Sequence, residues 1–234
     1  KNILDHSSEN ETIFYYNNDI IAIYSPDGSS NVIERIDLLN ARSVNLVLKN
    51  IYLINYPWEF NDISEEIIRD NLEYFLSYMG FDEYMKGVYI KGSVDISPKA
   101  ILNASYGPII INKAKSIEPG SIINGYTIIR EGSYILGGKI SESIIGPVSK
   151  IGAEVSSSII DGYSNMQHHG YLGHSYIGEW VNIGAGTVFS DLKNTYGTVR
   201  VEWVGKRYDT GLIKVGSFVG DHVKIAINST IFSG

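Results

Sequence analysis

From about residue 88 onward, aliphatic residues recur every six positions, a period that neither a strand nor an α-helix produces. Isoleucine fills five evenly spaced positions between 111 and 135. With 44% hydrophobic residues in the chain, five evenly spaced apolar positions arise by chance in roughly 1–2% of placements. The repeat is therefore structural. It runs through Ile111, Ile117, Ile123, Ile129, Ile135, Ile145, Ile151, Met166, Leu172, Ile177, Ile183, Phe189, Ile213, Val219, Ile225 and Ile231, with a few slips between them.

Two neighbouring positions keep a fixed phase with these aliphatics. Small or β-branched residues stand two positions before them, as at Ser121, Thr127, Ser133, Ser143, Ser149, Ser158, Ser164, Ser175 and Thr187. Glycine often stands one position after them, as at Gly146, Gly152, Gly173, Gly178, Gly184 and Gly220.

These features agree if every sixth residue turns a corner of a triangular prism. The aliphatic side chain then fills the interior, the small residue fits the corner, and the glycine supplies a positive φ. The pattern predicts a left-handed parallel β-helix, with three hexads per coil and coils stacked about 4.8 Å apart. A β-sandwich is the alternative, but its period of two does not generate a strict period of six.

The first eighty residues follow a different pattern, because only Gly28 precedes Gly80 among the 24 glycines. A helix is predicted from Asp62 as N-cap, along the apolar stripe from Ile68 to Met79, to Gly80 just past its end. Four β-rich runs predict short strands, the first two as a hairpin: residues 12–16, 20–24, 44–48 and 51–54.

The chain is therefore expected to be mainly β, with two parts. Residues 1–86 form a small α/β segment, and residues 87–234 form the β-helix. An excursion at residues 190–212 interrupts the hexads and carries Arg200 among four cations. Loops that leave a β-helix commonly cover a binding site, so we expect this one to contact substrate, although a solvated basic loop would have the same composition.

Composition narrows the functional class. The absence of cysteine excludes disulfides and thiolate chemistry. A net charge of −7 argues against nucleic acid or a membrane surface as the main partner. Neither a stretch of ~18 apolar residues nor a signal-peptide pattern occurs, so a soluble, cytoplasmic chain is expected.

Ionisable side chains are densest in residues 164–187, where His168, His169, Tyr171, His174 and Asn182 fall between the aliphatics. Imidazole is well suited to take a proton near neutral pH. Residue pattern alone leaves an exposed turn pair, or a metal site of the three histidines, as alternatives. On an extended strand, two adjacent histidines would point to opposite faces.

Residues 171–187, YLGHSYIGEWVNIGAGT, preceded by His168, resemble the acetyltransferase half of the bifunctional glucosamine-1-phosphate acetyltransferase/N-acetylglucosamine-1-phosphate uridylyltransferase (GlmU) family. Residues 199–207 and 216–229 are most similar to archaeal sugar-phosphate nucleotidyltransferases of this group. Residues 58–69 are similar to bacterial proteins in which the end of a nucleotidyltransferase-like domain joins the same β-helix.

This resemblance implies an acetyl-CoA-dependent transferase that acts on an amino-sugar phosphate or a nucleotide sugar. It implies a homotrimer with no metal requirement for the transfer. His168 matches the general base, and Ala185 matches the position whose backbone meets acetyl-CoA. Tyr171, Asn182 and, more weakly, Arg130 match residues that bind the sugar phosphate.

The chain departs from the family pattern at several positions. Ser156 stands in place of a substrate lysine, Asp191 in place of an asparagine, Gly197 in place of an archaeal lysine, and Asp221 in place of a serine. The first eighty residues also lack the Gly-rich loop that nucleotidyl transfer requires. A non-catalytic trimerisation or regulatory module of a nucleotidyltransferase is therefore the alternative function.

Overall fold

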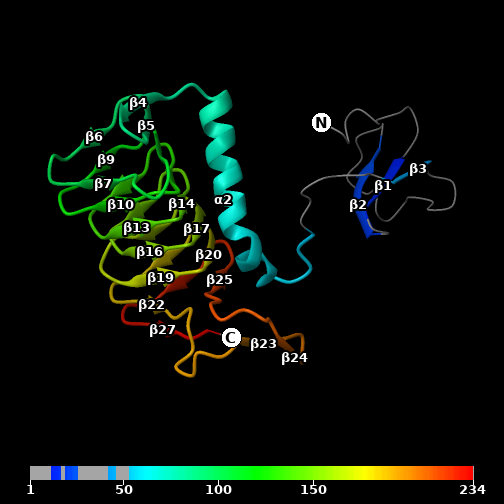
Figure 1. Ribbon diagram of the computed structural model, residues 1–234. Coiled ribbons are helices and arrows are strands. Elements are labelled where there is room, and N and C mark those ends of the chain that lie inside the picture. The colour runs from blue at the N-terminus through cyan, green and yellow to red at the C-terminus, as the bar shows by residue number, and fades with distance from the viewer. Residues whose placement is uncertain (1–11, 17–18, 26–41, 46–52, 234) are drawn as a thin grey trace. The chain divides into compact units, whose positions relative to one another are not determined.

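The computed structural model describes residues 12–16, 19–25, 42–45 and 53–233. The chain divides into two compact units, residues 1–53 and 54–234. Figure 1 draws each unit as a ribbon. Within the described residues, no helix is both long and apolar enough to cross a membrane.

The first unit contains a small sheet. Strand β1 (Thr12–Tyr16) pairs antiparallel with β2 (Asp19–Tyr24) and parallel with β3 (Arg42–Asn45). The predicted hairpin is confirmed. The strand predicted at 44–48 begins two residues earlier, and its continuation past residue 45 lies outside the described residues. Of the strand predicted at 51–54, only residues 53 and 54 are described, and they are not extended in a sheet.

The second unit is a prism with three sheet-forming faces, and successive strands visit the faces in turn (Figure 1). The first face contains the parallel strands β5 (Val88–Lys91), β8 (Ile109–Asn112), β11 (Thr127–Ile129), β14 (Ile144–Ile145), β17 (Ile159–Gly162), β20 (Tyr176–Glu179) and β25 (Phe218–Val219), with β4 (Asp82–Met85) antiparallel at its edge.

The other two faces each contain seven described strands. The second face is formed by β6 (Asp95–Ile96), β9 (Ser116–Ile117), β12 (Tyr134–Ile135), β15 (Lys150–Ile151), β18 (Asn165–Met166), β21 (Asn182–Ile183) and β26 (Lys224–Ile225). The third face is formed by β7 (Ile101–Asn103), β10 (Ile122–Asn124), β13 (Lys139–Ser141), β16 (Glu154–Ser156), β19 (Tyr171–Gly173), β22 (Val188–Phe189) and β27 (Thr230–Ile231). The left-handed parallel β-helix expected from the hexads is confirmed.

The prism interior follows the phase of the sequence repeat. The aliphatics from Ile111 to Phe189 are buried, and those of the last coil pack against them at partial burial. The corner serines are buried too, and several of their hydroxyls accept a hydrogen bond from the next coil. Ser158 N–H donates to Ser143 Oγ at 3.2 Å, and Ser175 N–H donates to Ser158 Oγ at 3.0 Å. A ladder of hydroxyls thus satisfies backbone donors that would otherwise be buried without partners.

The role expected for the glycines was wrong. Positive φ occurs instead at the residue before the small corner residue, as at Tyr126 (57°), Tyr163 (50°) and Trp180 (60°). The glycines after the aliphatics have another reason: a Cβ on Gly146 would overlap the carbonyl oxygen of Asp161 in the next coil. Close stacking of coils, rather than backbone conformation, selects glycine there.

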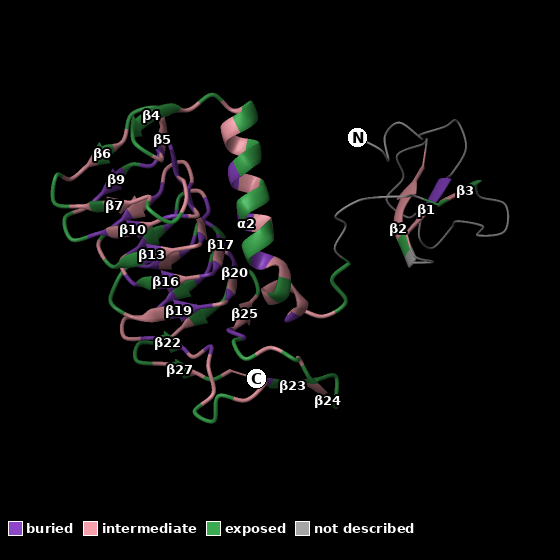
Figure 2. Cartoon of the chain, viewed as in Figure 1, coloured by how far each residue is buried: buried purple, intermediate pink, exposed green. Residues whose placement is uncertain are grey.

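Helix α2 (Glu59–Tyr78) covers part of the first face, and it belongs to the same compact unit as the prism. Its residues Ile68 and Leu72 are buried against Ile110 and Ile128. In Figure 2, buried and exposed stretches alternate along this helix, as one packed side requires. The compact unit that contains the β-helix therefore begins at Ile54 and includes α2, and the division between residues 86 and 87 stays a prediction.

The predicted start of the helix was wrong by four residues, because the N-cap is Trp58 and not Asp62. The helix begins at Glu59, so Asp62 lies inside its first turn, and the N-cap Trp58 makes no side-chain capping bond. Glu59 Oε2 instead accepts the Asn55 N–H at 2.6 Å and the Tyr56 N–H at 3.3 Å. The predicted end is confirmed, because Gly80 adopts a φ of +62°.

The excursion forms an antiparallel hairpin of β23 (Arg200–Trp203) and β24 (Lys206–Asp209). An aromatic cluster anchors it: Trp58 stacks on Tyr56 at 4.6 Å between ring centroids and lies 5.6 Å from Tyr208. The hexad position expected at Ile213 was wrong. Its side chain is 53% exposed, because residues that leave the coil need not face the interior, and Val215 is buried beside Trp58 instead.

Candidate functional site

His168 and His169 lie at the corner between the second and third faces. Both occupy a bend between β18 and β19, and both side chains are exposed. The expectation that they face opposite sides of an extended strand was wrong, because the chain turns the corner at these two residues.

Ala185 lies at the same corner, one coil further along. Gly186 N–H donates to the His169 carbonyl at 2.9 Å, which joins the two coils, and Asn228 N–H donates to the Ala185 carbonyl at 2.7 Å. The His169 Nε2 atom lies 3.6 Å from the position that a Cβ on Gly186 would occupy. The structure therefore brings His168 and Ala185 to one corner in consecutive coils.

Asn182 approaches this corner from the second face. It is the first residue of β21, exposed, and in register between Asn165 of β18 and Lys224 of β26. The side chains of these three residues share a face, so amide and ammonium groups border the corner where Ala185 lies.

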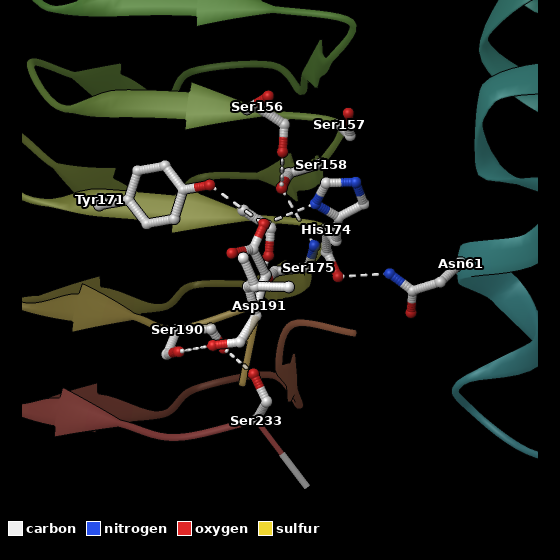
Figure 3. A network of polar contacts seen from close by, with 12 residues as sticks. Asn61, Ser156, Ser157, Ser158, Tyr171, His174, Ser175, Ser190, Asp191 and Ser233 are labelled. Carbon is white, nitrogen blue, oxygen red and sulfur yellow. Dashed lines mark hydrogen bonds and ion pairs between the residues drawn. The ribbon is translucent and has the colours of Figure 1, made fainter. Parts of the chain in front are cut away.

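Tyr171 follows the same corner as the first residue of β19, but its hydroxyl lies at the far end of that strand. It donates to Asp191 Oδ2 at 3.0 Å, and His174 Nδ1 lies 2.6 Å from the same oxygen (Figure 3). Gly173 makes room for this arrangement, since a Cβ there would overlap both the Tyr171 hydroxyl and the Asp191 carboxylate. Tyr171 is therefore directed toward the corner between the third and first faces.

The cluster of Tyr171, His174 and Asp191 is well shielded from water. The side chains of His174 and Asp191 are 17% and 9% exposed. Burial alone would raise the pKa of Asp191, but the hydrogen bond and charge of His174 and the Tyr171 hydroxyl outweigh it and hold that pKa below its ordinary value. Burial raises the pKa of Tyr171, and the charge of Asp191 raises it further. Tyr171 therefore keeps its proton and Asp191 is a carboxylate.

The backbone carbonyl of His174 also binds two other segments. Its carbonyl accepts the side-chain amide of Asn61 from α2 at 2.5 Å and the N–H of Gly216 at 2.9 Å. At the base of the excursion, Val215 N–H donates to the Asp191 carbonyl at 2.9 Å. The helix, the excursion and the third face meet at this residue (Figure 3).

The pairing of His174 with Asp191 was missed in the sequence, although both residues had been singled out there. A usable signal exists: coils in this region advance by 17 residues, since Tyr171 pairs with Val188 and Leu172 with Phe189. That register places residue 191 beside residue 174.

Arg130 and Arg200 lie away from the His168 corner. Arg130 follows β11 at the corner between the first and second faces, and its Nη2 lies 3.1 Å from Glu131 Oε1. Its Nε is buried without a hydrogen-bond partner. Arg200 lies on the hairpin, and its Nε is 3.4 Å from Asp209 Oδ2. Within one chain, neither guanidinium joins the corner histidines.

The alternative of a metal site built from three histidines is wrong. His174 lies at a different corner from His168 and His169, and its ring pairs with Asp191. Among the residues that the structure describes, no three His, Asp or Glu side chains are grouped to hold a metal ion.

Comparisons with known proteins agree with the resemblance seen in the motif. No family model matches the chain. A "bifunctional sugar-1-phosphate nucleotidylyltransferase/acetyltransferase" of Sulfurisphaera tokodaii is 32% identical over 239 residues, which cover 96% of this chain and 54% of that protein. A "bifunctional protein GlmU" of Methanocaldococcus jannaschii is 31% identical over 80% of this chain and 43% of its own length. Another, of a Picosynechococcus species, is 31% identical over 53% of this chain and 32% of its own length.

The chain thus spans about half of the length of the first of these relatives, and less of the others. The resemblance to GlmU-type bifunctional enzymes, with archaeal proteins among the relatives, is confirmed.

Proposed function

We propose that this chain, a relative of the GlmU-type bifunctional enzymes, transfers an acetyl group from acetyl-CoA to the amino group of an amino-sugar phosphate or nucleotide sugar. One observation carries the proposal. Similarity to a named nucleotidylyltransferase/acetyltransferase extends over 96% of the chain. Within that similar stretch, the β-helix supports the assignment by bringing His168 and Ala185 to one corner in consecutive coils.

His168 acts as the general base of this reaction. Its imidazole takes a proton from the amino group while the amine nitrogen attacks the thioester carbonyl carbon. A C–N bond forms, the C–S bond breaks, and coenzyme A leaves as a thiolate that is then protonated. The Ala185 backbone lies beside the thioester, at a corner where Gly184 and Gly186 keep side-chain bulk away.

The acceptor is bound by Tyr171, Asn182, Arg130 and Arg200. The two arginines lie at other parts of the chain and are paired with Glu131 and Asp209. We therefore infer that a homotrimer completes the site, with the arginines of one copy facing the His168 corner of another. A phosphate on the acceptor then competes with the carboxylates for the guanidinium groups.

The alternative function is a non-catalytic trimerisation or regulatory module. The engagement of the Tyr171 hydroxyl by Asp191 favours it, because Asp191 replaces an asparagine of the family pattern. Nucleotidyl transfer is not assigned to this chain, because its first eighty residues contain only Gly28 and Gly80 and so lack a Gly-rich phosphate loop.

Thermal unfolding with and without acetyl-CoA tests the enzyme proposal. A ligand that binds only the folded state at 100 times its Kd adds about 2.7 kcal/mol of stability. For a chain of this size that corresponds to a rise in Tm of roughly 5–10 °C. ATP at the same concentration is the control for unspecific anion binding. Equal shifts with ATP and acetyl-CoA, or no shift with either, would favour the non-catalytic module.

A further inference from the structure

The hydroxyl of Tyr171 has one hydrogen to donate, and the structure shows where it goes. It points to Asp191 Oδ2 at 3.0 Å. A phenol has a single O–H donor, so once this hydrogen is committed only the lone pairs of the oxygen remain for a ligand. An ionised carboxylate can only accept, which fixes the direction of the bond.

His174 keeps Asp191 in place. Its Nδ1 lies 2.6 Å from the same oxygen, and because the carboxylate accepts, Nδ1 carries a hydrogen in this contact. Charge-assisted bonds of this length are about twice as strong as neutral ones. If the Tyr171 hydroxyl turned toward another acceptor, the Asp191 carboxylate would lose the hydrogen bond from Tyr171. The Asp191 side chain is only 9% exposed, so this loss would be costly.

A second carboxylate lies on the other side of Tyr171. Glu154 of β16 is in register with Tyr171 on the outer side of the third face, and Lys139 Nζ lies 3.6 Å from its Oε1. Asp191 and Glu154 both raise the pKa of Tyr171, after the larger effect of burial. A phosphate dianion at the Tyr171 hydroxyl would therefore lie beside the Asp191 carboxylate, with Glu154 in the neighbouring coil, and such an approach of like charges is unfavourable.

We propose that Asp191 is a specificity-determining residue, which makes Tyr171 a hydrogen-bond acceptor and thus selects a substrate that presents an O–H or N–H group to it. A sugar hydroxyl or an amine meets this requirement, whereas phosphate oxygens do not. Any phosphate of the acceptor is then bound elsewhere. The identity of the ligand as an amino sugar rests on the function proposed above.

Calorimetric titration of the full chain with D-glucosamine and with glucosamine 1-phosphate tests this inference, using wild type, Tyr171→Phe and Asp191→Asn. Tyr171→Phe should weaken both sugars alike, by about tenfold, since each loses the same hydrogen-bond acceptor. Asp191→Asn should shift the ratio of the two Kd values by about tenfold toward glucosamine 1-phosphate, because one negative charge is removed and the hydroxyl can donate. The ratio of the two Kd values is taken within one protein, so a structural change that weakens both sugars equally leaves this ratio unchanged.

If Tyr171→Phe weakens glucosamine 1-phosphate but leaves D-glucosamine unchanged, Tyr171 contacts the phosphate and the inference is overturned. An unchanged ratio in Asp191→Asn also overturns it. So does failure of the wild type to bind either sugar at millimolar concentration. Should Asp191→Asn not fold, the Tyr171→Phe comparison still decides. Acetyl-CoA is titrated separately into the same proteins, and its failure to bind would refute the acetyltransferase while the sugar ratios still report on Asp191.

Discussion

His168 and His174 stand six residues apart in the sequence, yet the chain turns a corner between them and their surroundings differ. His168 is exposed in a bend. His174 is 17% exposed and pairs with Asp191 at 2.6 Å. The exposed imidazole of His168 can contact a substrate, whereas the imidazole of His174 is paired with Asp191. We therefore expect replacement of the two histidines to have different effects.

Replacement of His168 by alanine should lower acetyl transfer by roughly 10²–10⁴, which is the usual contribution of a positioned general base. Because the imidazole acts on the acceptor amine, binding of acetyl-CoA should change little. Steady-state rates with glucosamine 1-phosphate, together with calorimetric Kd values for acetyl-CoA, measure the two effects.

His222 is the better of two possible histidine controls for His168→Ala. His222 is exposed at the corner between the first and second faces, so His222→Ala should retain wild-type rates. His169 is less suitable as a neutral control, because its ring lies beside Gly186. Full activity of His168→Ala on an acceptor that the wild type acetylates would rule out the assigned base.

Asp191→Asn should destabilise the chain by about 1–3 kcal/mol at pH 7, because a charged acceptor shared by two partly buried donors is lost. The pKa of Asp191 is held below its ordinary value of 3.8. A lowered folded-state pKa gives stabilisation that is complete above the ordinary value and is lost as pH falls through the lowered one. The stability difference between wild type and variant should therefore narrow below pH 3.8.

Urea unfolding at pH 7, pH 5 and about pH 3 measures this difference. Equal differences at all three pH values would mean that the Asp191 charge does not contribute. Glu66, exposed on α2, provides the matched carboxylate control, and Glu66→Gln should unfold like wild type throughout.

At the scale of elements, the coils are joined by close backbone contacts that the hexad spacing does not reveal. Gly146 and Gly220 occupy equivalent places, each one residue after a core aliphatic. A Cβ on Gly146 would overlap Asp161 of the next coil, whereas a Cβ on Gly220 would meet nothing within 4 Å. Neither glycine has a positive φ, so steric contact alone distinguishes them.

Gly146→Ala should therefore destabilise the β-helix by about 1–3 kcal/mol, the usual effect of overpacking. In a chain of this size that lowers Tm by roughly 2–12 °C. Gly220→Ala should unfold within about 1–2 °C of wild type. Differential scanning calorimetry of the two variants makes the comparison, and equal Tm values would refute the close-approach explanation.

At the scale of the whole molecule, we expect the β-helix unit to assemble as a homotrimer. Helix α2 covers part of the first face, which leaves the second and third faces for neighbouring copies. Arg130 and Arg200 lie apart from the His168 corner within one chain, so an assembly is needed to unite the proposed site. Light scattering should give three times the chain mass of 26.0 kDa. A monomer at micromolar concentration would contradict this expectation.

The hexad repeat was enough to predict the β-helix and its core. A six-residue period is a local property of the backbone, and stacked coils repeat it, so Ile111 or Leu172 could be placed inside the prism from sequence alone. The end of α2 at Gly80 was equally local. Its start was not, because Glu59 binds the backbone of residues 55 and 56, a contact that competes with the apparent cap at Asp62.

Contacts between coils were decided only by the tertiary structure. Whether a glycine provides a positive φ or makes room for the next coil depends on what lies one coil away, as Gly146 shows. The exposure of Ile213 was likewise decided by the tertiary structure, because the chain leaves the coil there. In the sequence, Asp191 is only a departure from the family pattern, because its partners Tyr171 and His174 lie 20 and 17 positions earlier. Spacing along the chain determines which residues face inward, whereas the stacking register determines which side chains meet, and chemistry depends on the second.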